Sequence, residues 1–274
     1  MTPGDQHPPM PRRRGSRFSP AFRVARIVES SRCRLRRFKT HLNTDIQHDI
    51  FLEIELMMLA LATGIMDAMT FPDYHTFASN QTGNTALLAV GALDIGGGIV
   101  DLRPVGVSLG RFVGGGLLFG QLGNYLGSGR RYWLLLTNLF QTCLVFAAAG
   151  MHSHTDAVRR TLSYDLGIIA LLAFASGAQV ALARSIHMPE ITTAMVTSAY
   201  IDLLIDSKIL KKDNRSRNRR FFFVFCLVLG SFIGAITYRY MSPAFALYLS
   251  GTVKALVCIA VLFNPGAKNE LTCG

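Results

Sequence analysis

The sequence predicts an all-α fold, a polytopic bundle of transmembrane helices with six full spans, two short helices and an inverted repeat. Half of the 274 residues are hydrophobic and only 16% are charged, whereas soluble domains have about a quarter charged residues. Eight apolar segments follow one another, separated by breaks rich in glycine and proline. The basic residues gather outside these segments, as they do in membrane proteins.

Six of the eight apolar segments are long enough to cross a membrane, because about 20 helical residues span roughly 30 Å of hydrocarbon. The second and the sixth are shorter and more polar. None has the charges every three or four residues that mark an amphipathic soluble helix. The expected helices are Phe51–Phe71, Ser79–Val90, Val105–Leu126, Tyr132–Met151, Leu166–Ala183, Ile191–Ile205, Phe221–Tyr240 and Ala244–Phe263.

The charge distribution predicts three parts, which are a basic, disordered cytoplasmic tail over 1–48, a transmembrane domain over 49–265 and a short C-terminal tail over 266–274. The first part has eleven Lys and Arg residues and three acidic ones. Retention of Lys and Arg on the cytoplasmic side explains this better than nucleic-acid binding, for which no module is visible. We therefore expect a multi-pass protein of the plasma membrane or an organelle membrane, with the lipid bilayer as its partner.

The remaining basic clusters distinguish two topologies, both with a cytoplasmic N-terminus. If all eight segments cross, Arg130 and Arg131 lie outside and the basic run 208–220 lies inside. If the two short segments enter and return on the same side, both clusters lie inside and only Arg159 and Arg160 lie outside. The positive-inside rule favours the second, six-span arrangement, although the preference depends on one arginine pair.

A weak internal repeat favours the same arrangement. The segment Gly64-Ile65-Met66-Asp67-Ala68 is followed by Thr82-Gly83-Asn84, and Gly177-Ala178-Gln179-Val180-Ala181 is followed by Thr197-Ser198-Ala199. From glycine to threonine the spacings are 18 and 20 residues. In six spans the two halves would enter from opposite sides, as in many transporters. Chance similarity between apolar segments rich in small residues is the alternative.

Two of these motifs resemble the signature of the YoaK family of membrane proteins, also called domain of unknown function 1275. They are Gly64-Ile65-Met66-Asp67-Ala68 and, after Phe77, Asn80-Gln81-Thr82-Gly83-Asn84-Thr85. The stretch Thr192–Thr197 is similar to the second-half counterpart, with Ser198 where the family usually has glycine. The resemblance extends over about Phe51 to Phe263. It implies a six-span protein, sometimes described as a permease, and brings no settled substrate or reaction.

Polar residues inside the apolar segments are the candidate substrate-binding residues. Asp67 is the foremost, because ionisable groups in membrane spans mark ion, proton or substrate paths; a position near the membrane interface is its alternative. Thr82, Gly83 and Asn84 begin a short helix, where free N–H groups suit an anion; the alternative is that Thr82 or Asn84 caps the helix or bonds across to another helix. Gln179 and Thr197 are the candidates of the second half, and a structural hydrogen bond is the alternative for Gln179.

Other polar residues are assigned structural roles. Arg111 and Arg184 are expected to reach the lipid headgroups, although Arg111 is also a possible ion-pair partner of Asp67. His152 and His154 are expected in an exposed loop rather than at a metal. Gly110, Gly114, Gly116, Gly120, Gly230 and Gly234 are expected to allow close helix packing.

The sequence favours a transporter or permease for a small polar or anionic solute, coupled to a proton or another ion. A non-transporting scaffold or sensor remains the alternative, in which the basic tail and loop bind lipid or protein. An enzyme is not expected, because catalytic motifs are absent. No metal or cofactor is expected, and the oligomeric state stays open.

Overall fold

The chain is all-α over the residues that the computed structural model describes, which are 42–44, 49–95, 97–98, 100–157, 162–211 and 213–264. Most of both predicted tails, 1–48 and 266–274, lies outside these residues. No strand is present among them, and their helices are α2 (Ile50–Tyr74), α3 (Gln81–Ala92), α4 (Leu102–Leu126), α5 (Arg131–Ala157), α6 (Leu162–Ser185), α7 (Val196–Leu204), α8 (Arg215–Tyr240) and α9 (Pro243–Phe263).

Each predicted helix corresponds to one of these helices. Five of the described helices, α4, α5, α6, α8 and α9, are long and apolar enough to cross a membrane, so the protein is an integral, multi-pass membrane protein. Helix α2 is not among the five. It has 25 residues, about 38 Å at 1.5 Å per residue, but it contains Glu53, Glu55, Asp67 and Asp73.

Helix α7 is shorter than predicted, because the chain turns before it. The prediction began at Ile191, whereas the helix begins at Val196. Thr193 has a φ of 60°, in the left-handed region, and the Thr192 hydroxyl donates to the Met195 carbonyl over 2.6 Å. This turn uses five residues that the apolar pattern alone would place in the helix.

Contacts between helix termini define two ends of the bundle. At the first end, Arg215 at the start of α8 donates to Glu53 at the start of α2 over 2.9 Å, and Asn264 after α9 donates to Glu55 over 3.3 Å. At the second end, Asp73 of α2 accepts from the Tyr238 hydroxyl of α8 over 2.8 Å. The long helices therefore alternate in direction between the two ends.

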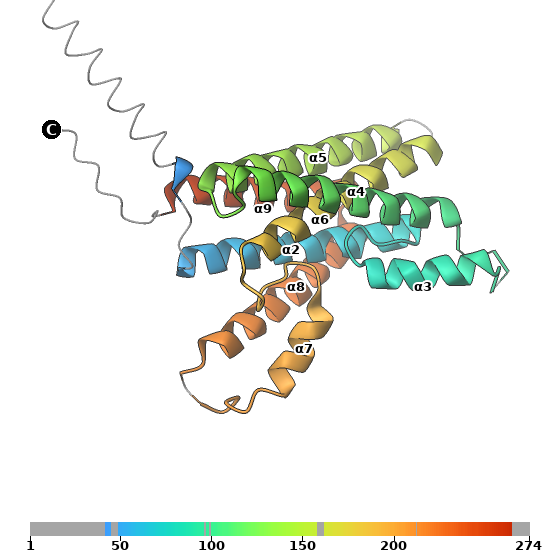
Figure 1. Cartoon of the computed structure of the whole chain (residues 1–274). Coiled ribbons are helices and arrows are strands. Elements are labelled where there is room, and N and C mark those ends of the chain that lie inside the picture. The colour runs from blue at the N-terminus through green and yellow to red at the C-terminus, as the bar shows by residue number, and fades with distance from the viewer. Residues whose placement is uncertain are drawn as a thin grey trace, which may run out of the picture. The chain divides into compact units, whose positions relative to one another are not determined.

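The helix pairs repeat in a regular order. Helix α4 packs on α6 as α2 packs on α8, and α5 packs on α6 as α2 packs on α9. The short helix α3 packs on α4, which follows it, and the short helix α7 packs on α8, which follows it. In Figure 1, α3 and α7 lie at the margins of the set of long helices. If α2 is exchanged with α6, α3 with α7, α4 with α8 and α5 with α9, the same pairs of helices are therefore in contact.

Glycines bring the two closest helix pairs together at equivalent positions. A Cβ on Gly115 of α4 would overlap the carbonyl oxygen of Phe174 in α6, and one on Gly230 of α8 would overlap that of Leu61 in α2. Close approach at Gly230 was predicted. Gly110 was predicted to pack in the same way, but a Cβ there would meet nothing within 4 Å.

Two further glycines, one in each half of the chain, approach the backbone of a neighbouring helix at corresponding positions. A Cβ on Gly177 of α6 would overlap the carbonyl oxygen of Phe112, and one on Gly64 of α2 would overlap that of Leu227. Lipid provides little hydrophobic drive for helix association, so this backbone proximity supplies the packing contacts. The glycines of the predicted repeat, Gly64 and Gly177, thus occupy corresponding places.

Substituting Gly115 with alanine should destabilise the bundle, because helix α6 must shift to make room. We expect a loss of about 1–3 kcal/mol, the usual cost of overpacking, measured as a lower unfolding temperature in detergent. Gly110→Ala on the same helix is the matched control and should leave the unfolding temperature unchanged or slightly higher. Equal effects of the two substitutions would contradict the proposed packing.

Candidate functional site

A cavity of about 830 Å³ lies between α2, the two short helices and α8. Helix α2 contributes its second half from Gly64 to Pro72, and α8 contributes residues that include Ser231 and Phe232. Phe112 of α4 and Arg184 of α6 also line the cavity. The cavity thus receives residues from both halves of the chain.

Both short helices begin at this cavity. Thr82 in the first turn of α3 and Thr197 in the first turn of α7 line it, and both side chains are exposed. Asn80 caps α3 by accepting from the Gly83 N–H over 3.2 Å, whereas Met195 at the start of α7 makes no side-chain capping bond. Helix N-termini present N–H donors and a partial positive charge, which suit an anion.

Asp67 lines the cavity and fixes the loop that leads into α3. Its carboxylate accepts from the Ser79 backbone N–H over 2.9 Å and from the Ser79 hydroxyl over 2.5 Å. The partner considered from the sequence, Arg111, is exposed on α4 and is not among the ion pairs of the described residues. Asp67 therefore both lines the cavity and positions the loop before α3.

Asn84 is buried and holds the same loop from its other side. Its side-chain oxygen accepts from the Thr76 hydroxyl and from the Phe77 N–H, both over 2.9 Å. Its side-chain nitrogen donates to the Phe77 carbonyl over 2.8 Å and approaches the Ser108 hydroxyl of α4 at 3.0 Å. These bonds join the loop, α3 and α4, and Asn84 does not line the cavity.

Gly83 and Gln179, two further residues predicted for the site, lie behind the lining. A Cβ on Gly83 would come within 3.1 Å of the Phe77 ring, so its lack of a side chain lets the loop pack on α3. Gln179 is buried in α6 and donates to the Thr63 hydroxyl of α2 over 2.9 Å. Its oxygen accepts from Lys254 of α9, a residue that the sequence reasoning did not single out.

Two cationic residues were missed or given another role. Arg184, which was expected to reach the lipid headgroups, is exposed and is one of the residues that line the cavity. Lys254 is buried, with 1% of its surface exposed. The signal for Lys254 was available, because it is the only charged residue in the apolar run Ala244–Phe263.

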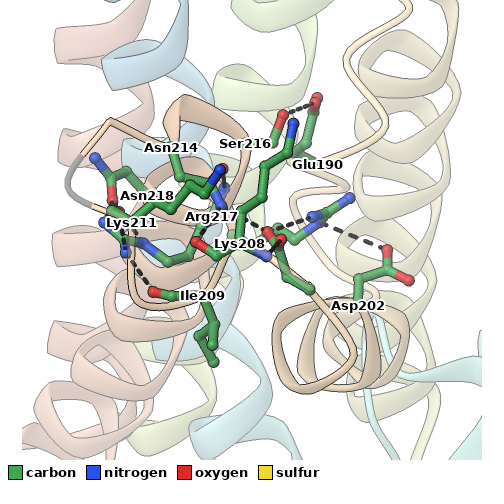
Figure 2. Close-up of polar contacts among 11 residues, drawn as sticks. Glu190, Asp202, Lys208, Ile209, Lys211, Asn214, Ser216, Arg217 and Asn218 are labelled. Carbon is green, nitrogen blue, oxygen red and sulfur yellow. Dashed lines mark hydrogen bonds and ion pairs between the residues drawn. The ribbon is translucent and has the colours of Figure 1, made fainter.

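The end of the bundle where α2 begins carries a network of ion pairs, drawn in part in Figure 2. Arg220 of α8 lies 3.7 Å from Asp202 of α7 and 3.9 Å from Asp206 in the following loop. Glu190, before α7, accepts from the Ser216 hydroxyl over 3.1 Å. The Asn214 side chain and a backbone N–H hold the pKa of Asp206 below its ordinary value. The network fastens α7 to α8.

His152 does not lie in an exposed loop, which corrects the prediction for it. Helix α5 continues to Ala157, and the His152 ring is fully buried, 2.9 Å from the Asp73 carboxylate. His154, two residues on, is exposed. Across the described ranges no group of three or more His, Cys, Asp or Glu residues is arranged to hold a metal ion. The expectation of no metal or cofactor stays a prediction.

Asn84→Ala should loosen the loop before α3, because the buried Thr76 hydroxyl and Phe77 N–H lose their acceptor. Each buried group left unpaired costs about 1–3 kcal/mol, so we expect a lower unfolding temperature and faster proteolysis within residues 75–80. Thr85→Ala is the control, since its exposed hydroxyl bonds only the Gln81 carbonyl in the described structure. Equal proteolysis of both variants would contradict this role of Asn84.

Comparison with known proteins places the chain in a family. No curated protein and no solved structure matches it. The family described as "Protein of unknown function (DUF1275)" matches residues 56–260, which include all six predicted site residues and Lys254. This agrees with the resemblance inferred from the two motifs. The chain belongs to the DUF1275 family.

Proposed function

We propose that this protein is a transporter or permease for a small polar or anionic solute, built from two inverted halves. The observation that carries the proposal is the cavity at which α3 and α7 both begin. Helices that start near the middle of the membrane and direct their N-termini at a substrate are a recurring feature of secondary transporters.

Six spans and two short helices that do not cross are part of this proposal. Helix α3 has 12 residues and α7 has nine, about 18 and 14 Å, which is too short for roughly 30 Å of hydrocarbon. Helix α2 has the required length and packs on α8 and α9, both of which are apolar enough to cross. We count it as the sixth span.

An inverted relation of the halves follows if α2 crosses. The first half, α2–α5, then starts at the end of the bundle where Glu53 and Arg215 meet, and the second half, α6–α9, starts at the opposite end. The exchange symmetry of the helix contacts supports this relation. The first end also carries Arg131 and the basic run 208–220, so the positive-inside rule makes it cytoplasmic.

The chemistry of the lining supports a polar or anionic solute. Thr82, Thr197, Arg184 and the start of α7 bring hydrogen-bond donors to the lining, and Phe71, Phe77, Phe112 and Phe232 supply apolar surface. Binding sites commonly combine apolar lining with a few placed polar groups. Asp67 is the ionisable group of α2 at this cavity and our first candidate for coupling to a proton or another ion.

The scaffold or sensor alternative receives less support from the basic loop. Arg215 and Arg219 both donate to Glu53, and Arg220 lies near Asp202 and Asp206. Arginines engaged with acids of the same chain have less capacity to bind anionic lipid. The predicted lipid-binding tail, 1–48, lies mostly outside the described residues.

Flux measurements on the purified protein in liposomes test the proposal. The probes are chloride, nitrate, phosphate, a small dicarboxylate and a neutral polyol of similar size. We expect at least one anion to cross faster than in protein-free liposomes. Asp67→Asn and Arg184→Gln should each lower that flux about tenfold, which corresponds to about 1.4 kcal/mol in the barrier.

Asp101→Asn is the control, because Asp101 is an acid at the start of α4 that does not line the cavity and can still cap the helix as asparagine. Its flux should equal that of the wild type. Wild-type flux no higher than that of protein-free liposomes for every probe would refute the proposed function. Unchanged flux in both cavity variants would refute the assigned site.

A further inference from the structure

Lys254 is a buried cation in the middle of an apolar helix. It is the twelfth of the 21 residues of α9, and 1% of its surface is exposed. An ammonium group is costly at such a depth unless it is paired or has a function. In the described part of the chain, no carboxylate lies within ion-pair distance of it.

Two glutamine side chains from different helices hold this amine. Its Nζ donates over 3.0 Å to Oε1 of Gln141 in α5 and also to Oε1 of Gln179 in α6. Gln179 continues through its nitrogen to the Thr63 hydroxyl of α2. The Lys254 cluster, defined as Lys254, Gln141, Gln179 and Thr63, therefore joins α2, α5, α6 and α9.

The glutamines suit both charge states of the amine. An ammonium offers three donors and no acceptor, whereas a neutral amine also accepts one hydrogen bond. A glutamine amide presents an oxygen or, after turning, an N–H. The Nε2 of Gln141 is buried and has no hydrogen-bond partner among the described residues, so it is free to turn toward a neutral amine. A carboxylate in its place would hold the proton on Lys254.

Few charges surround the cluster. Among the described residues, the ionisable group that interacts electrostatically with Lys254 is the thiol of Cys258, one turn further along α9, and Cys143 of α5 interacts with that thiol in turn. From α6 and α2 the facing groups are the neutral Gln179 and Thr63. Loss or gain of one proton at Lys254 thus changes the charge of this part of the core by a full unit.

The cluster adjoins the proposed solute site through α2. Thr63 directly precedes Gly64, which lines the cavity, and Gly64 lies against the backbone of α8 at Leu227, another lining residue. Its four helices include α2 and α6, whose positions relative to α8 and α4 set the width of the site. A change of charge at Lys254 would act on the packing of the helices that enclose the solute.

We infer that Lys254 is a second proton-carrying group of the transport cycle, binding one proton from water and releasing it again as the solute moves. The inference rests on the proposed function and extends it to a named coupling residue. The alternative is a purely structural role, in which Lys254 keeps one charge state and only joins the helices.

A stability measurement without solute tests the proton exchange. We would compare the wild type with Lys254→Met in detergent at pH 5.5 and pH 8.5. At low pH the wild type must keep a charge in an apolar core, so methionine should be more favourable there than at high pH. The difference in unfolding temperature should therefore change with pH. A constant difference would overturn the inference.

The controls separate this effect from others. Lys208→Met removes an exposed loop lysine, and its unfolding temperature should differ from that of the wild type by the same small amount at both pH values. If Lys254→Met does not yield folded protein, Lys254→Gln, which keeps hydrogen bonding and removes the charge, is measured in the same way.

A flux measurement tests the coupling itself. In liposomes that carry the transported probe anion, Lys254→Met should keep downhill flux but lose its acceleration by an imposed pH gradient. If the wild type transports the anion and the variant responds to the gradient as the wild type does, the role of Lys254 is overturned and the proposed function stands. A wild type without flux for every probe would overturn the proposed function, and the transport role of Lys254 with it.

Discussion

Close backbone contact between helices is the constraint on which this bundle depends. In lipid, helices gain little from burying apolar side chains against one another, so association relies on van der Waals contact and on polar bonds between helices. Four of the glycines that supply that contact form two equivalent pairs, Gly64 with Gly177 and Gly115 with Gly230. Each lies where any larger side chain would overlap the backbone of the neighbouring helix.

This packing leaves space where the short helices begin. The two tight pairs, α2 with α8 and α4 with α6, keep the long helices together, and α3 and α7 each pack mainly on the long helix that follows. The loop before α3 is fastened by Asp67 and Asn84, and α7 is fastened by the ion pairs of Asp202 and Asp206. The starts of α3 and α7 at the cavity are thus held in place by hydrogen bonds and ion pairs within the chain.

Much of the fold could be predicted from the sequence, because hydrocarbon requires long apolar helices. The eight helices and their order follow from apolar runs and breaks. Asp67, Thr82 and Thr197 could be selected because polar residues are rare in such runs, and they line one cavity. The partners of Lys254 could not be predicted, although its charge stands out in an apolar run, because they come from distant segments. Gln141, for example, contacts Lys254 across 113 positions of the chain.

The inverted six-span arrangement is tested most directly by the accessibility of single cysteines, placed at Ser128, Ser153, Ser207 and Ser242 in a background without native cysteines, to a thiol reagent that cannot cross the membrane. The account predicts that the cysteines at Ser128 and Ser207 react from one side of the membrane and those at Ser153 and Ser242 from the other. Reaction of the Ser128 and Ser207 positions from opposite sides would mean that α7 crosses, and reaction of Ser128 from the side opposite to the N-terminus would mean that α3 crosses; either result would contradict the account.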